Sequence, residues 1–328
     1  MDTVPKAIAL NINAIKGCVL GALLGDACGT SLDFLGRPPT QEEVKIALEM
    51  NGGGYFEIAS GQYTDDGEMT AALLDTIRAC GGQYEPIEVA KTYRRWLLSL
   101  PFDIRNATRI ALNGGGILDL DLPEQMMQRA KQHNYGSKTN GSLMRATPLA
   151  IAAARLSEEM AIDMVARDVG LTHPNPVCVV STTAYVLAIR QLILHFMDDQ
   201  GALSIVARYL QKTNTEVYGW YEDAMRGELP SAYPMSESVR YPFTYAMYHL
   251  KHETRYFEAI QHTLMMGGDT NTNACIVGGM VGAYHGHPLL PSILMRRLIR
   301  CNTKQGNQYR PEPYTIKRVL ENLECLTI

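Results

Sequence analysis

The stretch Gly267-Gly268-Asp269-Thr270-Asn271-Thr272-Asn273-Ala274 decides how this chain is interpreted. It joins a glycine pair to a run of oxygen-bearing side chains, and a helix-compatible segment with Gly278, Gly282 and Gly286 follows. A helix N-terminus with Asp and Thr side chains, preceded by glycines, suits a cation or a phosphate. The alternative is an ordinary helix capped by Asp269 or Thr270. Taken alone, the stretch favours the capped helix.

A second helix with a glycine stripe is predicted over residues 12–29. Gly17, Gly21, Gly25 and Gly29 lie four residues apart and therefore share one helix face. Each glycine costs a helix about 1 kcal/mol relative to alanine, so four on one face need a compensating contact. That contact is either another backbone or a ligand. Our hypothesis is that the two helices with glycine stripes pack against each other or together form the floor of one pocket.

A second cluster of oxygen-bearing side chains, Thr64-Asp65-Asp66, precedes a helix predicted over residues 71–80. Helix capping is again the simple interpretation, since acidic residues are favourable in a first turn. Two adjacent carboxylates repel each other unless they are solvated or bind a cation. Two such clusters, each beside glycines and opening a helix, favour a site for a hard cation such as Mg²⁺ or Mn²⁺.

Three further features were considered as sites. The loop Gly136-Ser137-Lys138-Thr139-Asn140-Gly141-Ser142 is polar and flanked by glycines, so it either presents backbone N–H groups to a phosphate or is a plain loop. His173, before a proline, either lines a pocket or sits in a turn, and the pocket is slightly favoured. His249 and His252 fit no common zinc-hydrolase signature and are expected on a helix surface.

The composition is that of an ordinary globular protein: 328 residues, 46% hydrophobic and 20% charged, with a net charge of -4. The lack of basic runs argues against general nucleic-acid binding. Seven cysteines without a CxxC pair indicate no disulfide framework and a reducing compartment. No signal peptide is expected, and the longest apolar runs are predicted to be too short, or too rich in Gly and His, to span a bilayer. A cytoplasmic protein that binds no membrane follows, with non-classical export left open.

Helical periodicity runs through the whole chain, and alternation typical of strands is absent. Thr40 and Glu43 form a predicted capping box. No linker or low-complexity tract divides the chain, so residues 1–328 are predicted to form one all-α domain. The other predicted helices cover residues 86–100, 157–170, 177–197, 255–266, 288–299 and 313–326, with one or two more in 201–229.

Five blocks in order resemble the ADP-ribosylglycohydrolases, a family that includes the dinitrogenase-reductase-activating glycohydrolase and ADP-ribosylarginine hydrolases. Each block is moderately specific, and their common order makes the resemblance specific over about residues 12–290. The blocks are residues 17–34, Tyr63-Thr64-Asp65-Asp66, Asn140-Gly141-Ser142-Leu143-Met144-Arg145, Thr172-His173-Pro174 and Gly267-Gly268-Asp269-Thr270-Asn271-Thr272-Asn273-Ala274.

The resemblance implies an orthogonal helical bundle with two divalent cations, Mg²⁺ or Mn²⁺. It implies a hydrolase that removes ADP-ribose from modified protein side chains, most of all arginine, by cleaving the bond at C1 of the ribose. A monomer that binds ADP-ribose and an ADP-ribosylated protein is expected. By similarity, the metal ligands are Thr64, Asp65, Asp66, Asp269, Asn271 and Thr272. The catalytic candidates are Asp33, Asp65 and Asp66, and the substrate-binding candidates are Gly136, Ser137, Lys138, Asn140, Gly141, Ser142, Met144, His173 and Gly268.

The chain departs from the family pattern at four positions. Asn271 stands where relatives have Asp, which removes a negative charge and is expected to weaken one metal site. Gly67 replaces a Thr, Asp33 shortens a loop Glu, and Arg105 stands where relatives often have Gly. The alternative is therefore a catalytically weakened or silent relative that binds ADP-ribose or a partner. A structural lens-type or storage protein on the same fold has no separate support in the sequence.

Overall fold

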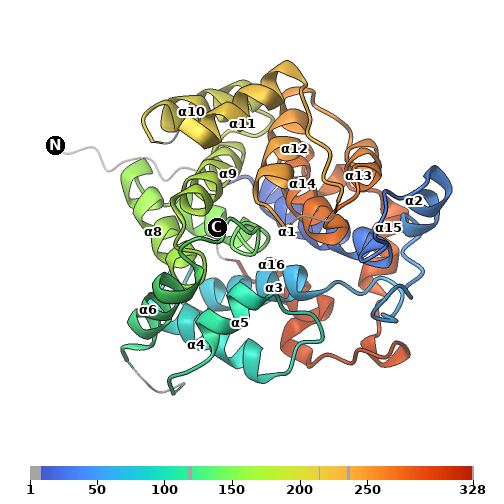
Figure 1. Ribbon diagram of the computed structural model, residues 1–328, viewed down its shortest axis with the longest axis horizontal. Helices are drawn as coiled ribbons and strands as arrows, with labels where there is room; N and C mark the ends of the chain where they lie inside the picture. The colour runs from blue at the N-terminus through green and yellow to red at the C-terminus, as the bar shows by residue number, and fades with distance from the viewer. Residues whose placement is uncertain (1–8, 117–119, 214, 235–236, 327–328) are drawn as a thin grey trace.

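The chain folds into α-helices joined by short loops (Figure 1). The structure is a computed structural model that describes residues 9–116, 120–213, 215–234 and 237–326. These residues include no strand, only isolated bridges between Gly53 and Ile58 and between Thr139 and Ser238. The predicted all-α class is confirmed.

The first half of the chain contains α1 (Ile12–Gly29), α2 (Gln41–Ala47), α3 (Asp65–Ala79), α4 (Pro86–Leu98), α5 (Asn106–Leu112), α6 (Leu122–Asn134), α7 (Thr147–Ala153) and α8 (Glu158–Gly170). The second half contains α9 (Pro176–Leu194), α10 (Asp199–Gln211), α11 (Thr215–Arg226), α12 (Arg240–Lys251), α13 (Tyr256–Met265), α14 (Thr270–His285), α15 (Ser292–Ile299) and α16 (Ile316–Glu324). Short 3-10 turns are η1 (Thr30–Leu32), η2 (His287–Leu289), η3 (Thr303–Gln305) and η4 (Glu312–Tyr314).

The glycine stripes of α1 and α14 bring these two helices into backbone contact at the centre of the fold (Figure 1). A Cβ atom on Gly17 would lie 2.0 Å from the carbonyl oxygen of Gly282, and one on Gly21 would lie 2.3 Å from that of Gly278. The end of α1 meets the start of α14 in the same way, at Gly29 and Asn271. The helices are therefore antiparallel, and the predicted packing of the two stripes is confirmed.

The remaining core is built around this pair. Helices α9, α12 and α13 pack against α14, and the Tyr185 hydroxyl of α9 donates a 2.8 Å hydrogen bond to the carbonyl of Ile276. By length and composition alone, residues Ile12–Leu32 and Pro176–Leu194 suffice to cross a membrane, which corrects the expectation that the apolar runs are too short, or too rich in Gly and His, to do so. The windows concerned are 83% and 78% buried inside the fold, so both behave as core helices.

Most predicted helices are present with shifted ends, and one shift bears on function. Helix α3 begins at Asp65, not at residue 71, so both carboxyl groups of the Asp65-Asp66 pair lie in its first turn. The segment 288–299 divides into η2 and α15, because Pro288 and Pro291 interrupt the helix. The capping box of Thr40 and Glu43 is present at α2. Helices α5, α6 and α12 were not anticipated.

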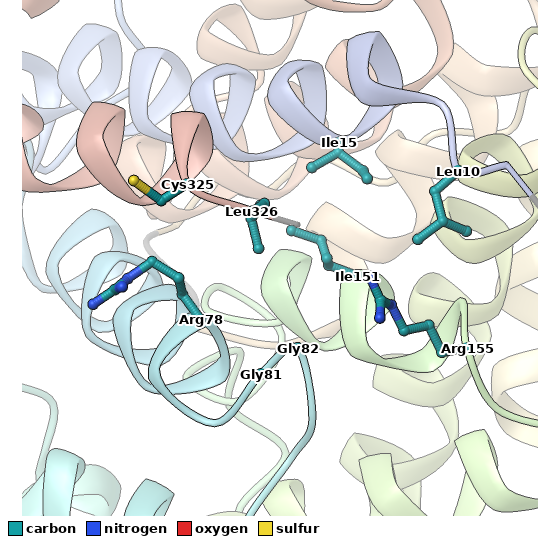
Figure 2. A pocket seen from close by; sticks show the side chains of 9 residues that line it. All are labelled: Leu10, Ile15, Arg78, Gly81, Gly82, Ile151, Arg155, Cys325 and Leu326. Carbon is teal, nitrogen blue, oxygen red and sulfur yellow. The ribbon is translucent and has the colours of Figure 1, made fainter. Parts of the chain in front are cut away.

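A small cavity of about 30 Å³ lies at the far end of α3 (Figure 2). Arg78, in the last turn of α3, lines it together with Arg155 and Leu326. Asp65, at the other end of the same helix, lies roughly 20 Å away by helix geometry. This cavity therefore belongs to a different part of the molecule from the acidic clusters.

Candidate functional site

Asp26, near the end of α1, organises the start of α3. Its carboxylate accepts hydrogen bonds from the backbone N–H groups of Thr64 and Gly67, both at 2.9 Å, and from the Thr64 hydroxyl at 2.9 Å. Thr64 holds the N-cap position but its side chain caps nothing. Burial raises the pKa of Asp26 to about 7, although these hydrogen bonds oppose the shift. Asp26 is not among the site residues expected from the sequence.

The start of α14 lies directly against the start of α3. The Asn271 amide nitrogen donates to Asp66 Oδ2 at 3.2 Å and to Thr64 Oγ1 at 3.1 Å. The Thr272 hydroxyl donates to Asp66 Oδ1 at 3.2 Å. Residues some two hundred positions apart in sequence are thus in contact, as the resemblance implies. The structure brings together the two clusters that the sequence analysis singled out.

Asp269 occupies the N-cap position of α14 without capping it. Its Oδ1 accepts a 2.7 Å bond from Arg105 Nη2, and its Oδ2 accepts a 2.8 Å bond from the Asn140 amide. The capping interpretation is therefore wrong for Asp269, whose side chain points to other segments of the chain. Asn140 links the loop before α7 to the acidic cluster.

Asp33 and Asp65 complete the cluster with carboxyl groups that have no hydrogen-bond partner among the described residues. They are 3% and 1% exposed, so bulk solvent does not reach them. One oxygen of Asp103, in the loop between α4 and α5, is also buried and unpartnered. The aromatic rings of Phe34, Phe56 and Phe102 pack together and tie the loops of Asp33 and Asp103 to each other.

The close approach of these carboxyl groups changes their acidity. Burial, then the negative charge of Asp269, raises the pKa of Asp33 to about 8. Burial raises the pKa of Asp65 well above its ordinary value, and Asp103 is the neighbour that adds most to this shift. Burial likewise raises the pKa of Asp66, with Asp26 the largest further contributor. A cluster of this kind binds either protons or cations.

Arg105, directly before α5, supplies the positive charge closest to Asp269. Its Nη2 atom also donates to Thr272 Oγ1 at 3.0 Å, and its Nη1 donates to Glu237 at 3.0 Å. Burial opposes its charged form, but Asp269, Asp65 and Asp66 outweigh burial, and the pKa of Arg105 stands well above its ordinary value. From the sequence, Arg105 stands out only as a departure from the family pattern, because a contact across 164 positions has no local signal.

The other predicted substrate-binding residues are divided between the core and the surface. Ser142 is buried and hydrogen-bonds with Thr182, and the carbonyl of buried Met144 accepts a bond from Thr70. Lys138 forms a surface ion pair with Glu216 at 2.8 Å. Gly136 is exposed and Ser137 and Gly268 are half-buried. Of this loop, Asn140 is the residue seen to hydrogen-bond the acidic cluster in the described part of the chain.

His173 is fully buried and packs against Gly141, where a Cβ atom would lie 2.8 Å from the imidazole Cε1. Its Nδ1 lies 2.8 Å from the Thr172 hydroxyl, and its Nε2 has no partner among the described residues. Burial, assisted by the charge of Arg145, lowers the pKa of His173 to about 3, so the ring is neutral. Gly141 is needed for the ring to lie where it does.

His249 corrects an expectation. It is 2% exposed and contacts His262, its Nε2 lying 3.3 Å from Nδ1 of that residue, so it belongs to the core and not to a helix surface. His252 is exposed as expected. Burial lowers the pKa of His249 to about 3.

The cluster fits a divalent cation on one side only. Buried carboxyl groups without partners, such as those of Asp33 and Asp65, are the ligands that hard cations prefer. On the α14 side, Asp269 and Thr272 are already hydrogen-bonded by Arg105. The described residues contain no group of three or more His, Cys, Asp and Glu arranged as a preformed metal site. The coordination would have to be completed by hydroxyl and amide oxygens and by water, after small movements of the side chains.

These features define a class: an all-helical protein with a closed cluster of carboxyl groups where three helix ends meet. The chain belongs to the ADP-ribosylglycohydrolase family, whose sequence profile matches residues 9–312. The family's enzymes hydrolyse a glycosidic bond of ADP-ribose, so the predicted enzyme class is confirmed at this level.

Individual relatives support the assignment across most of the chain. The ADP-ribosyl-[dinitrogen reductase] glycohydrolase of Rhodospirillum rubrum is 24% identical, with 86% of this chain and 89% of the relative covered. The ADP-ribosylarginine hydrolase Tri1 of Pseudomonas putida is 28% identical, with 85% and 72% covered. A solved structure described as an ADP-ribosylglycohydrolase-related protein complex matches the fold with a TM-score of 0.71 at 20% identity, over 96% of this chain and 97% of that one.

Proposed function

We propose that this chain is a cation-dependent hydrolase that removes ADP-ribose from modified protein side chains, with arginine the preferred linkage. Two curated relatives support the substrate class by their names, one acting on dinitrogen reductase and one on ADP-ribosylarginine. The observation that carries the proposal is the pair of buried, unpartnered carboxyl groups of Asp33 and Asp65 beside the paired Asp66. Structural carboxylates in a core are normally hydrogen-bonded, so these two are held ready for a ligand.

The chemistry follows from the bond that is broken. Cleavage at C1 of the ribose builds positive charge on the sugar ring, which nearby carboxylates stabilise. Burial raises the pKa of Asp33 to about 8 in the cation-free protein, so Asp33 is the candidate for donating a proton to the leaving group. Asp65 and Asp66 are the candidates for accepting a proton from water. A divalent cation, held by Asp65 with Asp33 and Asp66 nearby, would supply positive charge against the ribose oxygens and polarise water.

The test is release of ADP-ribose from arginine-, serine- and ester-linked substrates with Mg²⁺ or Mn²⁺ present. Asp65→Asn keeps the size of the side chain and removes its charge, so we expect a folded protein whose turnover is reduced by about 10²-fold or more. Asp163→Asn, in an exposed ion pair on α8, is the matched control and should turn over normally. Full activity of Asp65→Asn would contradict the proposal.

A silent relative remains the second candidate, because Arg105 and Asn271 alter the α14 side of the cluster. It predicts measurable ADP-ribose affinity by calorimetry and no turnover of any linkage. The hydrolase proposal predicts turnover of at least one linkage in the same preparation.

We also propose that the chain works in the cytoplasm as a monomer, without nucleic-acid or membrane partners. Its seven free cysteines suit a reducing compartment, and its two long apolar helices are mostly buried. Light scattering of the purified chain would test the monomer directly: a mass near twice 36.3 kDa would contradict it.

A further inference from the structure

Arg105 lies among the oxygen atoms that the family resemblance assigns to a metal ion. Its Nη2 atom is 2.7 Å from Asp269 Oδ1 and 3.0 Å from Thr272 Oγ1. The residue is 7% exposed, and its second terminal nitrogen is fixed by Glu237 at the edge of the site. The guanidinium therefore reaches the start of α14 from a different element, the loop before α5, and is held at both ends.

The carboxylate oxygens of the cluster divide into those that accept hydrogen bonds and those that do not, and the amide oxygens of Asn140 and Asn271 are also buried without a partner among the described residues. On the α14 half, both oxygens of Asp269 accept N–H bonds, and both oxygens of Asp66 accept bonds from Asn271 and Thr272. On the other half, Asp33 and Asp65 have four oxygens without a hydrogen-bond partner among the described residues. Protein donors thus replace a cation on one side, and nothing in the described chain does so on the other.

We propose that the Arg105 guanidinium permanently takes the place of one of the family's two divalent cations, so that this chain binds a single cation, at the unpartnered carboxyl group of Asp65. The inference rests on the cation dependence in the proposed function and changes the number of cations bound per chain from two to one. It also explains why Asn271 is tolerated: beside a fixed positive guanidinium, the α14 side has no second cation that would need another carboxylate.

The replacement has a chemical consequence. A guanidinium is a fixed single charge with N–H donors and no exchangeable ligands, so it can hold Asp269 and Thr272 in position but cannot coordinate a sugar hydroxyl or a water as a metal ion does. A second cation could bind only by displacing Arg105, which would leave a buried charge without partners. The wild-type chain should therefore resist a second cation even at high concentration.

Calorimetric titration with Mn²⁺ tests the stoichiometry without reference to turnover. We expect one Mn²⁺ per chain in the wild type and two in Arg105→Ala, with the second tightened when Asn271→Asp is added. Arg109→Ala, an exposed arginine one helix turn away, is the matched control and should bind one. Electron paramagnetic resonance gives a second reading, since adjacent Mn²⁺ ions couple and a single ion does not.

Three results would overturn the inference: two Mn²⁺ in the wild type, none in the wild type, or only one in a folded Arg105→Ala. Arg105→Lys is the second variant, in case Arg105→Ala does not fold; it keeps the charge and should bind one ion. The two ideas fail separately. A wild-type chain that binds one cation and shows no turnover contradicts the hydrolase proposal alone. An active enzyme that binds two cations contradicts only this inference.

Discussion

Asp269 shows how one side chain can be diverted from its local role. It holds the N-cap position of α14, where a carboxylate normally accepts a hydrogen bond from the first turn and stabilises the helix by about 1 kcal/mol. Here both oxygens are turned to Arg105 and Asn140 instead. The same holds for Thr64, whose hydroxyl donates to Asp26 and accepts from Asn271. At both helix starts, the contacts of the cluster outweigh capping.

The variant Asn271→Asp tests the role of a single side chain in the cluster. The amide nitrogen that donates to Asp66 and Thr64 would become a carboxylate oxygen facing another carboxylate. We expect the cation-free variant to lose about 1–3 kcal/mol of unfolding free energy, because two buried hydrogen bonds are lost. When Arg105→Ala is also present, Mn²⁺ should restore stability and bind more tightly, because the added charge then faces a cation in place of the guanidinium.

Thermal unfolding with and without Mn²⁺, together with calorimetry, measures both effects. Asn273→Asp is a useful comparison, since that amide contacts the Gly267 carbonyl and no carboxylate. If Asn271→Asp changed neither stability nor Mn²⁺ affinity when combined with Arg105→Ala, position 271 would not face a cation site.

At the scale of elements, the contact between α1 and α14 is the feature that positions the site. Gly21→Ala tests it, since the new Cβ atom would lie 2.3 Å from the carbonyl oxygen of Gly278 and backbone cannot move aside as a side chain can. We expect a loss of about 1–3 kcal/mol in unfolding free energy, because the two helices must separate. Separation also moves the end of α1, which holds the start of α3 through Asp26, away from the start of α14, so cation binding should weaken.

Gly219→Ala is the matched control for this variant. Gly219 lies inside α11 with nothing within 4 Å of its Cβ position, so alanine should stabilise the helix by about 0.5–1 kcal/mol. Chemical denaturation of both variants gives the comparison. Equal stability of Gly21→Ala and the wild type would show that the glycine stripe is not required for packing.

The glycine stripes are also where sequence reasoning was most successful. Four-residue spacing has a direct geometric meaning, so the α1–α14 contact could be predicted from it, whereas the meeting of the two acidic clusters was implied by the family resemblance. The start of α3 could not be placed well, because Thr64-Asp65-Asp66 looks the same before a helix and within its first turn. Asp26, Asp103 and Arg105 were missed as site residues since each acts through contacts with distant segments.

For the whole molecule, the buried carboxyl groups make stability depend on pH in an unusual direction. Asp26 and Asp33 have folded-state pKa values of about 7 and about 8, raised from 3.8 chiefly by burial. At pH values between 3.8 and these raised pKa values, the folded state holds protons that the unfolded state has released. The folded state binds more protons, so its stability falls as pH rises through this range. His249, its pKa lowered from 6.5 to about 3 by burial, acts in the opposite direction and only below about pH 6.5.

The window from about pH 6.5 to about pH 8 therefore isolates the carboxyl groups. For the cation-free protein, we expect the unfolding free energy to decrease with rising pH across this window, as measured by urea denaturation in the presence of a chelator. Asp33→Asn removes one titrating group and should flatten the decrease. Saturating Mn²⁺ should flatten it as well, because a cation stabilises the ionised carboxylates that burial otherwise penalises. A cation-free stability that rises with pH here would mean that the carboxyl groups are already ionised and compensated within the fold, and that no cation is needed to hold the site together.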